Sequence, residues 1–509
     1  MVSGDLAEAM WSATAVPAPG TAPLDGDRRV SVAIVGAGYT GLSTALHLAQ
    51  RGIDAVVLEA DDIGTGGSGR NGGHLTPTFH FRPEFSLANL KKRLGTDKAE
   101  RLIALQTGAA DLIFDLVDKY EIDCQLVRAG CIHAAHTPSM MAVLEEKYAD
   151  YQSLGRPMQL LDRDQTVTLT GSDKFHGAWV YENAGNMQPL SYARGLAGAA
   201  LREGARIFIQ TPVDRLERSG TAWRLTTSRG TVSADSVVIA TGAYGKALWP
   251  RLKQTYAPFA LGCAASAPLS DDVRRTVLPQ GNHLVDTRRD TFALMIDAGG
   301  RLVTAFNSAS WFGMSRRGMQ DLVDRRYTWA WPQLAGVKWE YLWEYFWTGA
   351  IDLRADLFPR LFELAPGLVT AIGFSGRGIP TGTALGDGAG NLLFALDRAE
   401  RNHVWQYVPR CHAVCNRGTA CSRCGRVVSG DRDLPSNGSA GLLGRNELQN
   451  DAARRRGRDT KSVRTHTIRR MGPIKAAFGR AEVSGFQGDS GNRRRRMGQG
   501  LGLLGKGFR

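Results

Sequence analysis

The most regular hydrophobic pattern of the chain lies near its N-terminus. Val30–Val35 is a short, mostly apolar and β-branched run, long enough for one buried strand of a parallel sheet. Leu42–Gln50 then places apolar residues at helical spacing, and Ala55–Leu58 forms a second apolar run. The sequence GAGYTG, residues Gly36–Gly41, joins the first run to the helix. This order predicts a strand, a tight turn, a helix and a second strand.

Each glycine of the turn has a physical task in such a unit. Gly36 lets the chain turn sharply, Gly38 lets the backbone approach a pyrophosphate, and Gly41 lets the helix pack close to the strand. The helix N-terminus offers free N–H groups to phosphates. Glu59 follows the second strand, where a carboxylate can accept hydrogen bonds from a ribose. A glycine turn without a nucleotide is the alternative, but the flanking strands, helix and acid favour a dinucleotide site.

A second glycine-rich segment, Gly64–His74, comes soon after Glu59 and is called here the SGRNGG loop. It holds six glycines in eleven residues, too many for a stable helix or strand. Backbone of this kind can lie close to a flat or charged ligand, with Ser68 and Arg70 as candidate phosphate partners. A flexible surface loop is the alternative, and the position just after the nucleotide unit favours the ligand.

Further along, the pattern alternates between helices and strands. Helical spacing covers 87–120, 139–154 and 188–204, and strands are predicted at 206–210, 222–228, 230–233 and 236–240. The last strand ends at Thr241-Gly242, a further close approach of backbone to a ligand at the sheet edge. Residues 255–345 hold short segments between Gly, Pro and Asp turns, which predicts an antiparallel sheet. The tryptophans between Trp311 and Trp347 either line a substrate cavity or cover this sheet.

A third glycine-rich segment, Gly373–Gly378, is called here the GFSGRG loop. It follows a strand-like run at 369–372 and precedes a helix that starts with Pro380 in its first turn and extends to about Leu396. A glycine loop that leads into a helix N-terminus is an anion site. It could stabilise negative charge on the ring of a reduced flavin.

Composition changes this picture mainly at the C-terminus. Residues 401–509 hold 23 Lys and Arg against 7 Asp and Glu, which leaves 40 basic and 42 acidic of the totals of 63 and 49 for residues 1–400. The basic character therefore belongs to the tail, and the body has a net charge of −2. The 509 residues predict more than one domain. No apolar run reaches the roughly 18 residues of a membrane span, and the N-terminus has acids where a signal peptide needs positive charge.

The cysteines are as uneven as the charge. Cys124, Cys131 and Cys263 are scattered through the body, which is no disulfide framework and fits a reducing, cytoplasmic setting. Four more cluster in the tail, where only five residues separate Cys415 from Cys421. That spacing is short for zinc, so no metal site is predicted. A nucleic-acid arm would have the charge but few aromatics for stacking. Out-of-frame translation explains the abrupt Arg/Gly/Ser composition better, and on any interpretation the tail is expected to be disordered.

Together these motifs resemble the D-amino-acid-oxidase-like family of FAD-dependent oxidoreductases, and most of all its gamma-glutamylputrescine oxidoreductase branch. The resemblance covers roughly residues 10–390 and rests on motifs that occur in family order. They are GAGYTG with Glu59, SGRNGG at 68–73, Pro212-Val213, ATGA at 240–243, DTRR at 286–289 and GFSGRG. His74 stands where this branch usually carries Gln.

The resemblance implies an α/β protein with a Rossmann-like FAD-binding domain and an α+β substrate domain built on an antiparallel sheet. The FAD domain would combine 30–85, 185–255 and 350–396, and the substrate domain 86–184 and 256–349. An extended lead-in, 1–29, would precede them, and the basic tail, 397–509, would follow. His74 and Arg377 are candidates for the reacting face. The residues expected to hold FAD are Gly36, Gly38, Tyr39, Thr40, Gly41, Glu59, Ala60, Ser68, Gly69, Arg70, Asn71, Gly72, Val213, Thr241, Gly242, Gly376, Arg377, Gly378 and Ile379.

The resemblance also implies a reaction, in which a small-molecule amine is oxidised at its C–N bond and O₂ is reduced to H₂O₂. A flavin performs the difficult step and the protein orients and polarises, so no dedicated acid or base is expected. An RNA-directed flavoprotein is the alternative from another class, because it would use the basic tail. The net charge of the body argues against nucleic acid as a partner. A third possibility is an inactive relic with a damaged C-terminus.

Overall fold

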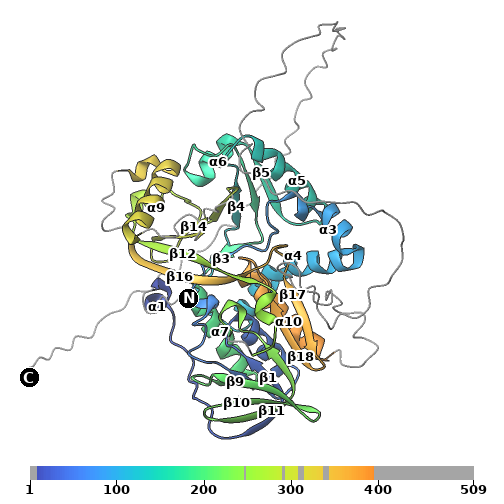
Figure 1. Ribbon diagram of the computed structural model, residues 1–509. Coiled ribbons are helices and arrows are strands. Elements are labelled where there is room, and N and C mark those ends of the chain that lie inside the picture. Colours follow the sequence, from blue (N-terminus) through green and yellow to red (C-terminus); the bar gives the residue numbers. More distant parts are fainter. Residues whose placement is uncertain (1–8, 246–247, 289–292, 308–314, 336–342, 395–509) are drawn as a thin grey trace, which may run out of the picture. The chain divides into compact units, whose positions relative to one another are not determined.

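The computed structural model describes residues 9–245, 248–288, 293–307, 315–335 and 343–394 (Figure 1). The chain divides into two compact units, Met1–Cys421 and Ser422–Arg509, and every described residue lies in the first. The predicted basic tail, 397–509, lies outside the described residues.

The first sheet is built around the strand that the opening motif predicts. Its central strand β1 (Arg28–Val35) pairs in parallel with β2 (Ala55–Leu58) on one side and β11 (Gly230–Ile239) on the other. The chain therefore leaves β1 towards one side and returns on the other, and ligands bind at the carboxyl ends of strands at such a switch point. The sheet continues with β8 (Arg206–Phe208), β9 (Val213–Ser219), β10 (Ala222–Thr227), β17 (Arg360–Ala365) and β18 (Leu368–Ile372).

Both faces of this sheet are buried, because successive side chains of a strand point to opposite faces. Ile34 and Val57 pack in one cluster with the helices α2 and α7, and Val35 and Val56 pack in another with the β9–β10 hairpin. The helices that contribute to the first cluster are α2 (Tyr39–Ala49), α4 (Thr96–Lys119), α7 (Pro189–Arg202) and α10 (Gly378–Phe394).

The second sheet confirms the predicted antiparallel architecture, with one parallel pair. Its order is β16 (Trp343–Leu353), β12 (Ala257–Pro268), β15 (Arg301–Asn307), β14 (Ala293–Ile296), β13 (His283–Asp286), β4 (Cys131–Ala134), β6 (Ala178–Tyr181) and β5 (Met158–Leu161). Only β4 and β13 among these described strands pair in parallel. A small ladder joins β3 (His74–Leu75) to β7 (Gly185–Asn186).

Further helices accompany the second sheet (Figure 1). They are α3 (Leu87–Leu94), α5 (Ser139–Ser153), α6 (Arg163–Thr170), α8 (Asp271–Arg274) and α9 (Arg316–Ala330). Helix α9 packs on the sheet through Val323 and Tyr327, which join Leu284 and Leu294 in one cluster. Trp331 belongs to the same cluster, and Trp347 is equally buried. These two tryptophans are therefore core, whereas Trp311, Trp339 and the side chain of Trp343 lie outside the described part of the chain.

Three details of the predicted elements were wrong. The lead-in is not simply extended, because the helix α1 (Met10–Thr14) buries Met10 and Trp11. The helical stretch from 87 to 120 is divided at Gly95, whose φ of 78° ends one helix and precedes the next. Residues 230–239 form the single strand β11 rather than two, since Ala234 keeps its pairing with Trp223 and Val30.

Candidate active site

A single cavity of about 1010 Å³ joins the three glycine-rich segments. Among the predicted site residues, all but Gly41 and Gly69 line it. It begins at the carboxyl end of β1 and β2 and extends along the SGRNGG loop to the GFSGRG loop. The cavity is also lined by Asp286 and Arg288 of the DTRR motif.

The turn after β1 has the close packing that the glycines predict. Gly36 has a φ of 106°, and a Cβ there would lie 2.8 Å from the carbonyl oxygen of Ala240. A Cβ on Gly41 would lie 1.9 Å from the oxygen of Gly36, so Gly41 serves packing between helix and strand rather than lining the cavity. Gly38 is the N-cap of α2 and brings no capping side chain. The N-terminus of α2 therefore faces the cavity as backbone, which suits a phosphate.

Glu59 follows the last residue of β2. Together with the turn after β1 and the N-terminus of α2 it forms what is called here the nucleotide cradle. Its carboxylate accepts hydrogen bonds from the N–H of Ala37, at 2.6 Å, and of Asp61, at 3.1 Å. Burial raises the pKa of Glu59 even though these bonds favour the ionised form. A carboxylate has about four acceptor positions, so capacity remains for ribose hydroxyls in the cavity that Glu59 lines.

The SGRNGG loop is held against α2 by its own polar groups. Ser68 Oγ accepts the N–H of Tyr39 at 3.0 Å, and the Tyr39 hydroxyl donates to the Ser68 carbonyl at 2.8 Å. The Asn71 amide donates to the same carbonyl at 2.7 Å and accepts the N–H of Gly73 at 2.9 Å. Gly69 donates its N–H to Gly64 within the loop, which explains why it does not line the cavity. Arg70 Nε donates to the carbonyl of Thr65 at 2.9 Å, and the side chain still borders the cavity.

The far end of the cavity contains a guanidinium among neutral imidazoles. His74, His80 and Arg377 all line this end. Burial, and then the charge of Arg377, lowers the pKa of His74 to about 4. The same two causes, in the same order, hold the pKa of His80 well below its ordinary value. Burial also lowers the pKa of Arg377.

Three buried nitrogen atoms at this end have no hydrogen-bond partner within the described residues. They are His74 Nε2, His80 Nε2 and Arg377 Nε. Buried polar atoms without partners are rare in folded proteins and call for an explanation. A bound substrate or cofactor would supply the missing partners.

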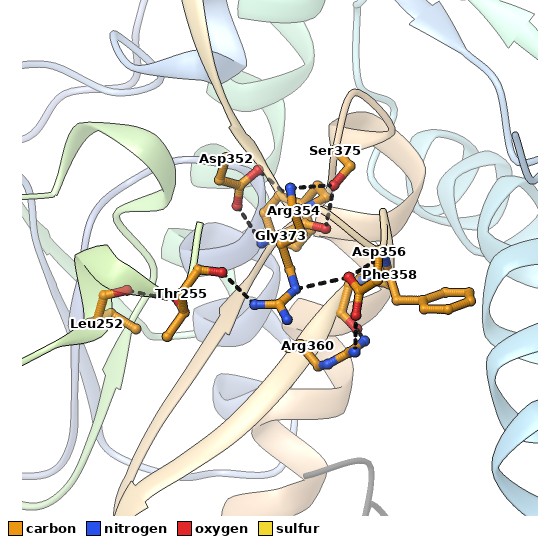
Figure 2. A network of polar contacts seen from close by, with 11 residues as sticks. Leu252, Thr255, Asp352, Arg354, Asp356, Phe358, Arg360, Gly373 and Ser375 are labelled. Carbon is orange, nitrogen blue, oxygen red and sulfur yellow. Dashed lines mark hydrogen bonds and ion pairs between the residues drawn. The ribbon is translucent and has the colours of Figure 1, made fainter. Parts of the chain in front are cut away.

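A polar network beneath the GFSGRG loop fixes its position (Figure 2). Asp352 of β16 accepts the N–H groups of Gly373, at 2.6 Å, and Phe374, at 3.1 Å. Ser375 Oγ accepts the N–H of Arg354 at 3.2 Å. Burial raises the pKa of Asp352 to about 6, against the opposing effect of these N–H groups. The loop that carries Arg377 is therefore attached to β16 at its first residues, and to Arg354, just after β16, at Ser375.

The Arg354 side chain extends the network away from the cavity. It donates to the carbonyl of Thr255, before β12, and to Asp356. Asp356 in turn pairs with Arg360 of β17. Figure 2 shows this chain of contacts from Thr255 through Arg354 and Asp356 to Arg360, which joins the end of β16 in the second sheet to β17 in the first.

Comparison with known proteins agrees with this geometry. The family model described as DAO, FAD dependent oxidoreductase, matches residues 31–392. The chain belongs to this family of FAD-dependent oxidoreductases, and it is an enzyme that binds FAD. The cradle, the backbone at the N-terminus of α2 and the unpartnered nitrogen atoms fit that cofactor.

Individual members of known families show how similar this chain is to particular enzymes. The chain is 32% identical over 388 residues to the gamma-glutamylputrescine oxidoreductase of Escherichia coli (strain K12), covering 74% of this chain and 86% of the relative. It is 28% identical over 227 residues to a glycine oxidase of Geobacillus kaustophilus, covering 44% of this chain and 57% of the relative. The crystal structure of a Geobacillus kaustophilus glycine oxidase shares the fold, with a TM-score of 0.59 at 23% identity, over 75% of this chain and all of that one.

Several cavity residues were not predicted from the sequence. Thr76 and His80 are among them, and the alternation His74, Thr76, Thr78, His80 was a signal that could have identified them. Nothing in the sequence around Asp352 or Tyr244 indicated that these residues would border the cavity. Tyr244 borders the cavity, and its hydroxyl accepts the N–H of Ala350 on the second sheet at 2.8 Å.

Other predictions concern the cysteines, the tryptophans, metal binding and the membrane; of the three cysteines, Cys263 lines the cavity. Cys124, Cys131 and Cys263 are free and buried, and burial raises the pKa of each thiol to about 12. No tryptophan in the described part of the chain lines the cavity. The described residues hold no group of three or more His, Cys, Asp or Glu placed to bind a metal ion. No helix in the described ranges has the length and apolarity needed to cross a membrane.

Proposed function

We propose that this enzyme is an FAD-dependent amine oxidase. Its substrate would be a primary or secondary amine, most of all a γ-glutamylated diamine or a similar ω-amino compound. The observation that carries the proposal is the single cavity that connects the nucleotide cradle at Glu59 with the imidazoles and guanidinium at its far end. The similarity to a gamma-glutamylputrescine oxidoreductase supports the substrate class.

The first sheet and its three loops would hold the cofactor. The α2 N-terminus and Ser68 would meet the pyrophosphate, Glu59 the ribose, and the SGRNGG and GFSGRG loops the ring system. The second sheet, with β16 and with β13, which ends at the DTRR motif, would cover the side of the cavity where the substrate binds. When bound, FAD accepts the two electrons and the hydrogen that leave the carbon bearing the amine.

The residues at the far end would select the reactive form of the substrate. An amine must lose its proton before its α-carbon can be oxidised. The positive charge of Arg377 disfavours a second cation nearby and so lowers the pKa of a bound ammonium group. His74, neutral because its pKa is about 4, can accept an N–H from the neutral amine. The substrate loses two electrons and two hydrogens to become an imine, which water converts to an aldehyde and ammonia or a smaller amine. We propose that O₂ takes up the electrons and two protons to give H₂O₂.

An anaerobic stopped-flow screen of amines, amino acids and NAD(P)H tests the proposal. We expect amines to bleach the flavin absorbance, at a rate that rises with pH until the bound amine is neutral, and air to produce H₂O₂. Bleaching by NADH and by no amine would refute the proposed substrate class. Reduction by amines without peroxide would retain the substrate class and replace O₂ with another acceptor. The buried free thiols support the further proposal that the enzyme works in the reducing cytoplasm.

A further inference from the structure

Two buried tryptophans lie behind the SGRNGG loop, on the side away from the cavity. Trp11 comes from α1 and Trp347 from β16, and their side chains are 1% and 2% exposed. The two rings meet edge to face, with centroids 5.8 Å apart and planes at 74°. Neither tryptophan lines the cavity, whereas Arg70, Asn71 and Gly72 do. The loop therefore lies between the tryptophan pair and the cavity.

The pair donates to two consecutive carbonyl groups of the loop. Trp11 Nε1 donates to the oxygen of Asn71 at 2.7 Å, and Trp347 Nε1 donates to the oxygen of Arg70 at 3.1 Å. The thiol of Cys263 approaches the Arg70 oxygen as well, at 3.7 Å. Both indole bonds are well within hydrogen-bonding range, and a buried indole N–H normally needs such a partner.

These bonds determine where the N–H groups of the same peptide units point. Across a trans peptide bond, the carbonyl of one residue and the N–H of the next point in opposite directions. The N–H groups of Asn71 and Gly72 therefore point away from the tryptophans. No acceptor in the described ranges takes either of them. Two adjacent donors are thus left for a ligand on the side where the loop borders the cavity.

We propose that Trp11 and Trp347 are positioning residues that present the N–H groups of Asn71 and Gly72 to the flavin ring. The place in the loop supports a ring contact rather than a phosphate contact. Ser68, three residues before Asn71 in the loop, meets the N-terminus of α2, and His74, at the end of the loop, borders the far end of the cavity. Asn71 and Gly72 lie between these two points.

The surroundings of each tryptophan hold it in place. The carbonyl of Trp11 accepts the side-chain amide of Gln188 at 2.8 Å, and Gln188 is the N-cap of α7. Just after α1, Val16 donates its N–H to Ser191 Oγ at 3.0 Å. On the other side, Gly349 lets β16 approach the loop, since a Cβ there would lie 3.1 Å from that of Arg70. The N-terminal segment thus acts on the cofactor loop although it lies outside the family-matched residues 31–392.

Trp11→Phe and Trp347→Phe test the proposal, with Trp331→Phe as the matched control. Trp331 is also fully buried and donates its indole N–H to a carbonyl, that of Thr170 at 2.8 Å, but its partner Thr170 does not line the cavity, whereas Arg70 and Asn71 do. Each replacement keeps an aromatic ring and removes one N–H. The measurements are the dissociation constant of FAD for the apoprotein, the long-wavelength absorption band of the bound flavin, and the thermal unfolding temperature.

We expect Trp11→Phe and Trp347→Phe each to weaken FAD binding by about two- to tenfold, the effect of one hydrogen bond, and to shift the flavin band. The control should lose similar thermal stability with an unchanged band and dissociation constant. If both test variants bind FAD as the wild type does, with the same spectrum, the tryptophans only pack the core and the proposal is wrong. Each variant addresses one peptide unit, so misfolding of one leaves the other as a test. Failure of the wild type to bind FAD would contradict the cofactor assignment instead.

Discussion

Replacing Asp352 with asparagine should change how the stability of the protein depends on pH. The pKa of this buried carboxyl is raised from the ordinary 3.8 to about 6, which corresponds to about 3 kcal/mol of disfavoured ionisation. Between these two values the folded protein holds more protons at Asp352 than the unfolded chain does. Stability from this group is therefore fully present below about pH 4 and is lost as the pH rises to about 6.

The asparagine amide is neutral throughout, so the difference in stability between variant and wild type should change by about 3 kcal/mol from pH 3 to pH 7. At an unfolding entropy of about 2.1 cal/mol/K per residue over residues 31–392, that is a change of about 4 °C in the difference between the two unfolding temperatures. Differential scanning calorimetry of both holoproteins across this pH range measures it. A difference that stays flat would refute the argument that burial outweighs the two N–H bonds.

The same variant tests whether Asp352 supports the GFSGRG loop. The amide oxygen can accept only from the direction it faces, so one of the N–H groups of Gly373 and Phe374 loses its acceptor. FAD binding should weaken. Asp297→Asn is the control, because Asp297 is also a buried acid with a raised pKa but does not border the cavity. Unchanged FAD affinity in Asp352→Asn would show that the loop holds its position without the carboxylate.

Three other predictions follow from the site. Gly41→Ala should prevent retention of FAD or folding itself, because the added Cβ would lie 1.9 Å from the Gly36 oxygen; flavin content of the purified protein measures this, and a yellow, stable variant would contradict the packing. His74→Gln should retain FAD and change the ranking of amines in the stopped-flow screen. In the wild type, the pH profile should show no ionisation of His74 between about pH 5 and pH 8, because the pKa of His74 is about 4. Removal of residues 397–509 should leave flavin content unchanged, and loss of FAD on truncation would show that the tail has a structural role.

The cofactor site could be predicted from the sequence because its residues are adjacent to glycines that the backbone requires. Gly36 and Gly41 show this, since Gly36 has the positive φ of the turn and Gly41 packs against Gly36 within the same strand–helix unit. Asp352 could not be found in this way, because its partners lie 21 and 22 residues further along the chain and nothing in the sequence of β16 identifies them. Trp11 was still harder to find, since its contact with Asn71 spans 60 residues and starts from a segment rich in proline. Local sequence motifs therefore identify residues that line the candidate cofactor cavity. The residues that support those motifs depend on tertiary packing, which the sequence does not reveal.

The charged groups near the cavity differ in whether the protein supplies them with a counter-charge. Asp286 pairs with Arg288, and Asp356 pairs with Arg354 and Arg360, so these buried or half-buried charges are compensated within the protein. For Arg377, the groups whose interaction with it shifts its pKa are Cys131 and Tyr151, and the described residues include no carboxylate within ion-pair distance of it. A half-buried guanidinium without a counter-charge lowers stability. We propose that the fold tolerates this cost because a cation near the reacting carbon would favour the neutral, oxidisable form of an amine, so that Arg377 and the uncharged His74 would act together in the proposed reaction.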